Sequence, residues 1–236
     1  MKTAFIFNTC MIISAMTLTS CVTETGGASL PPGPYSGVDI SPTSSIKIGE
    51  VYRSSIPLNQ QHQPELSELC PDDYSDTKAL AAIRKKYSAA EPTGKPDDIR
   101  SATNSRSLGV TGVNLAFLKA GATYKPQTTT TAEFKGVKYY ALNGDDENVV
   151  LQKLGKRCKA AIAQWRHRGH GVYIPVGAYR ADTVNITTKI DTTYDADIAV
   201  DIKKVKPGFK ISQTDSSSVT VSGKNYFYKV LPSSNN

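Results

Sequence analysis

The chain contains 236 residues, a length that fits one domain with a tail. Hydrophobic residues make up 39% of it and charged residues 21%, a little below typical globular values but enough to form a sizeable core. The formal net charge of +7 is a moderate excess, compatible with contact to anionic lipid, lipopolysaccharide or cell-wall polymer, and it does not indicate nucleic-acid binding.

The first twenty residues have the layout of a secretory signal peptide. Lys2 gives a positive start, residues 4–18 are mostly apolar, and Thr19 and Ser20 are small. The apolar stretch is short for a membrane-spanning helix, which needs about 20 residues. We therefore predict that residues 1–20 are removed, which lowers the net charge to about +6 because Lys2 is their only charged residue.

The residues Leu18-Thr19-Ser20-Cys21 resemble the lipobox of bacterial lipoproteins. In that family the cysteine is acylated and cleavage occurs before it, so the resemblance implies that Cys21 is the lipidation site and that the protein is anchored to a membrane. Val22 replaces the Asp that retains family members in the inner membrane, which implies an outer-membrane location, on the periplasmic face or the surface. The alternatives are an ordinary secretory signal and an uncleaved anchor.

Cysteine usage favours an oxidising compartment. Cys10 leaves with the signal and Cys21 takes lipid, so Cys70 and Cys158 remain in the mature chain. Two cysteines in an exported domain favour a disulfide between them. The alternative is a pair of buried free thiols.

Residues 21–45 are rich in Gly, Pro, Ser and Thr, so we interpret them as the lipidated Cys followed by a flexible tether. Residues 46–236 are then predicted to form one domain. Its first part should contain a strand at 46–53 and a helix at about 76–87, followed by a loop at 91–106.

The segments 108–118 and 122–142 are β-like and are predicted to pair as a hairpin. Their low charge leaves open a bilayer-inserting role, as an alternative to a hairpin in a soluble sheet. The clearest helix follows them, from acidic residues 145–147 to basic residues 166–168, which complement the helix dipole. Its apolar stripe comprises Leu151, Leu154, Cys158, Ile162 and Trp165.

The remainder is predicted to be a C-terminal β-meander. Its expected strands lie at 171–190, as one strand or as two broken near Pro175, and at 194–205, 209–213, 218–223 and 225–230. The predicted fold class is therefore α+β, a mostly antiparallel sheet with two helices packed on one face.

A cluster of basic residues lies on and around the second predicted helix. It suggests binding to an anionic lipid or glycan surface, or simply a solvated helix face. The residues are Lys153, Lys156, Arg157, Lys159, Arg166 and Arg168.

Two other patterns could be interpreted as metal sites, but each lacks a feature that such a site needs. His167 and His170 form H-x-x-H, but no third or fourth ligand is suggested nearby. Asp195, Asp197 and Asp201 share a strand face, whereas calcium loops need tight turns. We expect no metal and no cofactor.

No local catalytic motif occurs, although a dispersed catalytic site needs none. We therefore expect a non-enzymatic, lipid-anchored envelope protein that binds or scaffolds another envelope component. The partner would be a protein or an anionic glycan or lipid, and an exported location disfavours nucleic acid. The alternatives are a membrane-active protein and a hydrolase with a dispersed site.

Overall fold

The structure is a computed structural model of the chain. It describes residues 33–57, 64–70, 77–89, 91–103, 114–118, 128–190, 197–201, 208–215 and 217–233.

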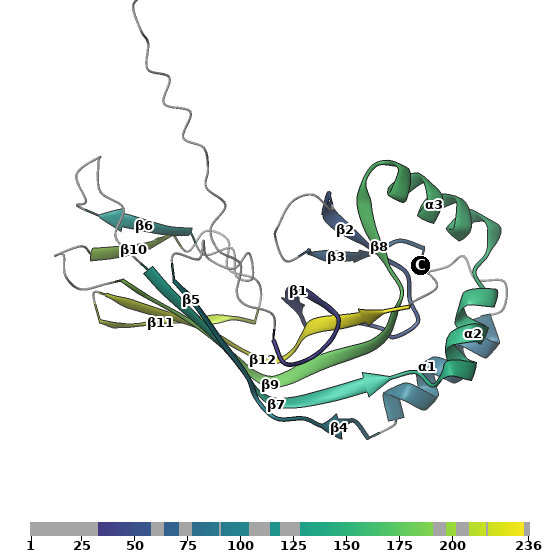
Figure 1. Cartoon of the computed structure of the whole chain (residues 1–236), viewed down its shortest axis with the longest axis horizontal. Coiled ribbons are helices and arrows are strands. Elements are labelled where there is room, and N and C mark those ends of the chain that lie inside the picture. Colours follow the sequence, from purple (N-terminus) through teal and green to yellow (C-terminus); the bar gives the residue numbers. More distant parts are fainter. Residues whose placement is uncertain are drawn as a thin grey trace, which may run out of the picture.

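Three long antiparallel strands form the centre of the fold (Figure 1). They are β7 (Thr128–Ala141), β9 (Pro175–Ile190) and β12 (Ser218–Pro232), within a seven-stranded sheet of order β1–β12–β9–β7–β4. Off this path, β11 pairs with β12 and β5 pairs with β7. The bounds of these shorter strands are β1 Val38–Thr43, β4 Thr93–Gly94, β5 Asp98–Thr103 and β11 Lys210–Asp215. The predicted α+β class, with a mostly antiparallel sheet and a C-terminal meander, is confirmed.

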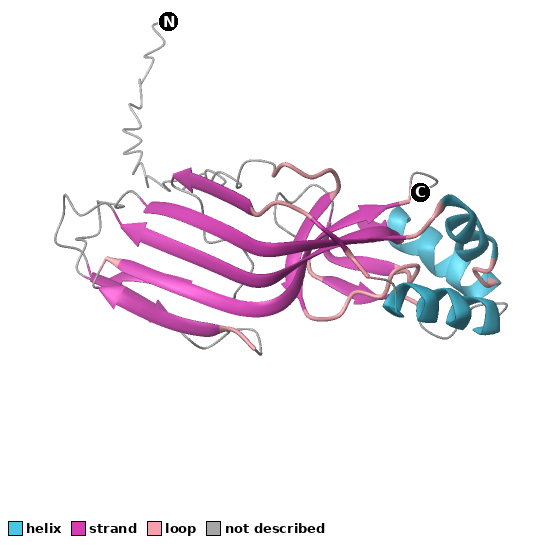
Figure 2. Cartoon of the chain, turned by 90° about the horizontal axis from the view of Figure 1, so that it is seen from below, coloured by secondary structure: helices cyan, strands magenta, loops and turns pink. Residues whose placement is uncertain are grey.

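Helices and a small second sheet gather at one end of the long strands. Figure 2 shows the helices together at that end. They are α1 (Thr77–Ala89), α2 (Gly144–Gln152) and α3 (Lys156–His167). The small sheet has the order β3–β2–β8, with bounds Leu66–Glu68, Tyr52–Pro57 and His170–Tyr173. Among the residues that the structure describes, no helix is long and apolar enough to cross a membrane.

The second predicted helix is divided into α2 and α3. Asn143 caps α2, because its side-chain oxygen accepts a hydrogen bond from the Asp146 amide at 2.8 Å. The helix ends at Lys153, and Gly155 is the extended N-cap of α3, with ψ 163°. Glycine is costly inside a helix, so the chain breaks there.

The helical end has its own buried core, which contains the predicted cysteine pair. Cys70 precedes α1 and Cys158 lies in α3, and their sulfur atoms are at disulfide-bonding distance with Cα atoms 5.5 Å apart. Leu80 of α1, Val150 of α2 and Ile162 of α3 pack in the same cluster. The pair therefore joins the segment that follows β3 to α3 within this core.

The long strands bend along a line that crosses the sheet. Gly136 in β7 and Asn225 in β12 have φ values of 62° and 60°, and the pairing register places both beside Asp182 of β9. A Cβ atom on Gly136 would lie 2.8 Å from the Asp182 carboxylate, so only glycine fits. The strands predicted at 218–223 and 225–230 are consequently one bent strand, because Asn tolerates a positive φ.

The predicted boundaries near the N-terminus are wrong. Residues 38–43, assigned to the tether, form β1, and Val38 pairs with Val230. The domain thus begins before residue 46. The strand predicted at 46–53 begins only at Tyr52, and the loop predicted at 91–106 contains β4 and β5. Short polar edge strands lack the apolar alternation that identifies a strand in sequence.

Within the described parts of the predicted hairpin, residues 114–118 and 128–142, the two segments do not pair with each other. β6 (Asn114–Leu118) pairs with β10 (Asp197–Asp201), and β7 pairs with β4, β5 and β9. Strand partners depend on contacts between distant segments, which β-propensity does not encode.

A buried group of charges connects the two edges of the sheet. The Arg100 guanidinium donates to both carboxylate oxygens of Asp98 on its own strand, at 2.8 and 2.6 Å. It also donates to Asp39 of β1 at 2.8 Å, and Lys229 of β12 lies 3.1 Å from the other oxygen of Asp39. Lys229 donates to the Tyr35 carbonyl at 2.9 Å as well. Two cations therefore balance two carboxylates.

A bulge and a close backbone approach make this charge cluster possible. The pairing register shifts between Phe227 and Lys229, which turns Lys229 toward its partners although Tyr228 beside it is also buried. A Cβ atom on Gly33 would lie 2.3 Å from the guanidinium of Arg100, so the chain passes close over that group. Burial alone would lower the pKa of Arg100, but its hydrogen bonds to Asp98 and Asp39 raise it.

Removing the central cation should destabilise the whole domain. Arg100→Met would leave the buried Asp98 carboxylate and the half-buried Asp39 carboxylate short of a partner, and we expect a loss of about 3–5 kcal/mol in the free energy of unfolding. Urea denaturation followed by circular dichroism measures this. Lys135→Met is the control, because Lys135 is exposed and its partner Glu133 is partly exposed, so we expect a much smaller loss from breaking this pair. Equal losses in the two variants would contradict the proposed role of Arg100.

The cysteine pair should contribute strongly to stability because it closes a long loop. With a sequence separation of 88 residues, removing the bond with the double variant Cys70→Ala/Cys158→Ala should cost about 4 kcal/mol. Thermal unfolding with and without dithiothreitol tests this. The wild type should lose stability on reduction and the double variant should not respond. A wild type indifferent to reductant would refute the bond.

Candidate functional site

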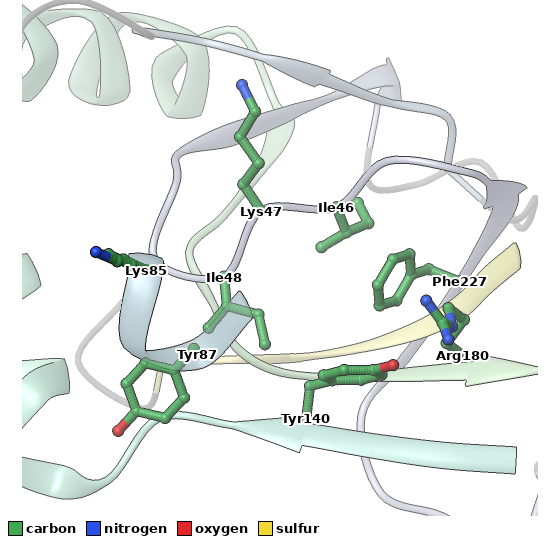
Figure 3. Close-up of a pocket in the computed structure, with 8 residues that line it drawn as sticks. All are labelled: Ile46, Lys47, Ile48, Lys85, Tyr87, Tyr140, Arg180 and Phe227. Atoms are coloured by element: carbon green, nitrogen blue, oxygen red, sulfur yellow. The ribbon is translucent and has the colours of Figure 1, made fainter. Parts of the chain in front are cut away.

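A pocket of about 440 Å³ lies beside the loop at 46–48 (Figure 3). The end of α1 and the strands β7, β9 and β12 complete it. We call it the aromatic–cationic pocket, and its lining residues are Ile46, Lys47, Ile48, Lys85, Tyr87, Tyr140, Arg180 and Phe227.

Side-chain alternation along the strands places three of these residues on one face of the sheet. Tyr139 and Tyr179 lie on the opposite face, with ring centroids 4.6 Å apart and ring planes tilted by 31°, at the core cluster that contains Tyr179. Successive side chains alternate, so Tyr140 and Arg180 point into the pocket. The Phe227 ring lies 5.8 Å from that of Tyr140 and completes the sheet side of the wall.

Arg180 is the charged centre of the pocket. Its guanidinium lies 5.4 Å from the Tyr140 ring, in a cation–π arrangement. Its Nε is buried and has no hydrogen-bond partner. The nearest strand carboxylate, Asp182, is already bound through both oxygens by Lys138, at 2.9 and 2.8 Å. The charge of Arg180 is therefore not neutralised by that carboxylate.

The lysines lie at the rim. Lys47 forms an ion pair with Glu68 at 2.8 Å, and its side chain is 54% exposed. Lys85 is also exposed. Figure 3 shows Ile46, Ile48, Tyr140, Arg180 and Phe227 grouped together, while the amino groups of Lys47 and Lys85 point away from them. The two lysine amino groups therefore do not fill the centre of the pocket.

Tyr87 forms the α1 side of the wall and is held from outside the pocket. Its hydroxyl donates to Asp146 at 2.5 Å and accepts from the Asn143 amide at 2.8 Å. Burial, followed by the bond to Asp146, raises the pKa of Tyr87. Hydrogen bonds from Lys86 and Tyr87 lower the pKa of Asp146. The hydroxyl is thus occupied, and the ring faces the pocket.

The lining combines cationic, aromatic and aliphatic side chains. Its eight residues include no carboxylate, imidazole or thiol. One central cation among aromatic and aliphatic walls suits an anionic group attached to an apolar body.

The basic residues predicted as an anionic-surface site do not form one helix face. Lys153 ends α2, Arg168 ends α3, and the other four lie within α3. At about 100° per residue, Lys156, Lys159 and Arg166 lie on one side of α3 and Arg157 on another. The four in α3 and Arg168 are exposed.

Two arginine side chains at this end of the molecule lie over the ring of Trp165. The guanidinium of Arg53 lies 4.0 Å from its ring centre and that of Arg168 lies 5.4 Å away. His170 contacts the ring edge, with centroids 4.9 Å apart, and its Nδ1 lies 3.2 Å from the Ser54 carbonyl. These contacts give His170 a packing role.

The remaining candidate residues are only partly placed. Cys21 and Asp195 lie outside the described residues, as do the side chains of Asp197 and Asp201 on β10. Within the described part of the chain, no three His, Cys, Asp or Glu side chains come together as a metal site.

The comparisons with known proteins add no assignment. No protein-family model matches the chain. A search of curated proteins also finds no match.

Sequence reasoning missed the aromatic–cationic pocket. Its residues come from a loop, a helix and three strands. The one local signal was the alternation of side chains in β7, which predicts that Tyr139 and Tyr140 lie on opposite faces of the sheet. That signal does not show which segments cover either face.

Asp146→Asn should weaken the attachment of α1 to α2. Loss of the charge that holds Lys86 and Tyr87 should cost about 1 kcal/mol at neutral pH, because the site is partly exposed. The folded pKa of Asp146 is lowered. Its stabilisation is therefore full above the ordinary Asp value and is lost as the pH falls through the lower folded value.

Thermal unfolding at pH 7 and pH 3 should accordingly give a difference from wild type that shrinks at pH 3. Asp145→Asn is the matched control, because it removes the same charge from the same helix turn. A difference that grows on acidification would reverse the assignment.

Proposed function

We propose that this chain is an exported lipoprotein, anchored to a bacterial membrane through Cys21, whose domain binds another envelope component and does not catalyse a reaction. The observation that carries the proposal is the apolar signal-like segment ending in Leu18-Thr19-Ser20-Cys21. The proximity of Cys70 and Cys158 supports it independently, because disulfides persist in oxidising compartments.

The spacer in this proposal is shorter than the sequence pattern suggested. β1 already belongs to the domain, and described structure begins at Gly33. A fully extended chain from Cys21 to Gly33 spans at most about 40 Å. The domain would therefore work close to the bilayer that holds it.

The partner in this proposal is a protein or an anionic lipid or glycan, and the membrane is outer, as Val22 implies. The exposed cations of α3 and the cluster around Trp165 suit such a partner. Arg and Trp are also enriched where proteins bind each other.

The alternative roles are less well supported. A bilayer-inserting hairpin needs the segments 108–118 and 122–142 to pair, whereas β6 pairs with β10. The acid–base group of a hydrolase is most often a histidine or a carboxylate, and the lining of the aromatic–cationic pocket contains neither.

Metabolic labelling with radioactive palmitate tests the anchor directly. The wild type expressed in a Gram-negative host should incorporate label and fractionate with the outer membrane. Cys21→Ala should abolish the label, because it removes the acylated sulfur. Cys10→Ala is the matched control and should retain the label. Unlabelled wild-type protein, or label that persists in Cys21→Ala, would exclude lipidation at this residue.

A further inference from the structure

We infer that the aromatic–cationic pocket binds a single-chain anionic amphiphile, with its acid group on Arg180 and its chain against the apolar wall. This inference deepens the proposed function, since it names the ligand of a chain that acts by binding.

We infer the acid group of the ligand from the lack of a hydrogen-bond partner for Arg180. Its buried Nε lacks an acceptor, and no ion-pair or hydrogen-bond partner for its guanidinium occurs in the part of the chain that the structure describes. Lys138 holds both oxygens of Asp182, so the strand offers Arg180 no substitute for an external anion. A carboxylate or phosphate would accept charge-assisted hydrogen bonds there.

The apolar chain follows from what surrounds that charge. Tyr140 and Phe227 form one wall, and Ile46 and Ile48 approach from the loop (Figure 3). These side chains offer few donors to a small inorganic anion, which would lose its hydration without full replacement. A chain attached to the acid would instead bury apolar surface against them.

The charge balance favours one acid group over several. Lys47 is paired with Glu68, and its amino group points away from the pocket centre. Arg180 is then the cation at the centre, and the volume of about 440 Å³ is in the range of small-molecule sites. Fatty acids and single-chain phospholipids share this chemistry, and different probes distinguish them.

Isothermal titration calorimetry with soluble probes below their micelle concentration tests the inference. The protein is the full chain carrying Cys21→Ala, so that its own lipid cannot occupy the site. Dodecanoate represents a fatty acid and dodecyl phosphate a phospholipid headgroup with one chain. At least one should bind at one site per chain, and dodecyltrimethylammonium and inorganic phosphate should bind at least tenfold more weakly.

Substitution of the central cation supplies the second arm. Arg180→Met should weaken binding of the better anionic probe at least tenfold. Lys189→Met is the matched control, since it removes one exposed positive charge about 30 Å further along β9. Its binding should equal that of the parent chain.

Several results would overturn the inference. They are equal binding of the cationic amphiphile, binding of inorganic phosphate as tight as that of dodecyl phosphate, no binding of either anionic probe, and equal affinity in the two substituted chains. If Arg180→Met does not fold, Ile48→Glu decides, because it places a carboxylate in the wall and should also reduce binding at least tenfold. Palmitate labelling is read separately, so failure of the anchor and failure of the pocket remain distinguishable.

Discussion

Arg100 holds the two edges of the main sheet together, since it binds Asp98 on β5 and Asp39 on β1 at once. β1 and β5 lie at opposite ends of the strand order, so these contacts can form only if the sheet curls over its own core. Ionised side chains are costly to bury unless paired, and here Lys229 supplies the second cation that balances two carboxylates. Burial and the nearby Asp98 carboxylate raise the pKa of Tyr228, so its hydroxyl stays protonated beside the cluster.

Curling of the sheet depends on the bend line. Gly136 and Asn225 adopt positive φ on the two strands that flank Asp182. The Gly136 amide donates a hydrogen bond to the Asp97 side chain at 2.9 Å. The same bend leaves Lys138 and Asp182 bound to each other beside Arg180. Because Lys138 binds Asp182 at this bend, Arg180 in the aromatic–cationic pocket is left without that carboxylate.

The helical end is stabilised in a different way. Within its own core, the Cys70–Cys158 pair joins the segment before α1 to α3. Tyr87 and Asp146 join α1 to the start of α2. These contacts fix one wall of the pocket, so the helices position the site even though its charged centre lies on the sheet.

The sequence by itself determined the features that depend on neighbouring residues or on simple counting. Apolar spacing identified α1, most of β9 and the two halves of β12, and acidic residues after Asn143 identified the start of α2. The number of cysteines that remain after residue 21 identified the pair at Cys70 and Cys158. Such signals depend on neighbouring residues or on a residue count, so they can be recognised without knowledge of the fold.

Only the tertiary structure decided which distant segments meet. β1 and β5 have little apolar alternation in sequence. They are strands because they pair with the edge-facing sides of β12 and β7. Arg180 resembles any other strand cation in sequence, and it acquires an unneutralised charge only because Lys138 binds Asp182 and the loop at 46–48 covers Tyr140. Those contacts join residues more than forty positions apart, and no local pattern specifies them because their energy exists only once the chain has folded.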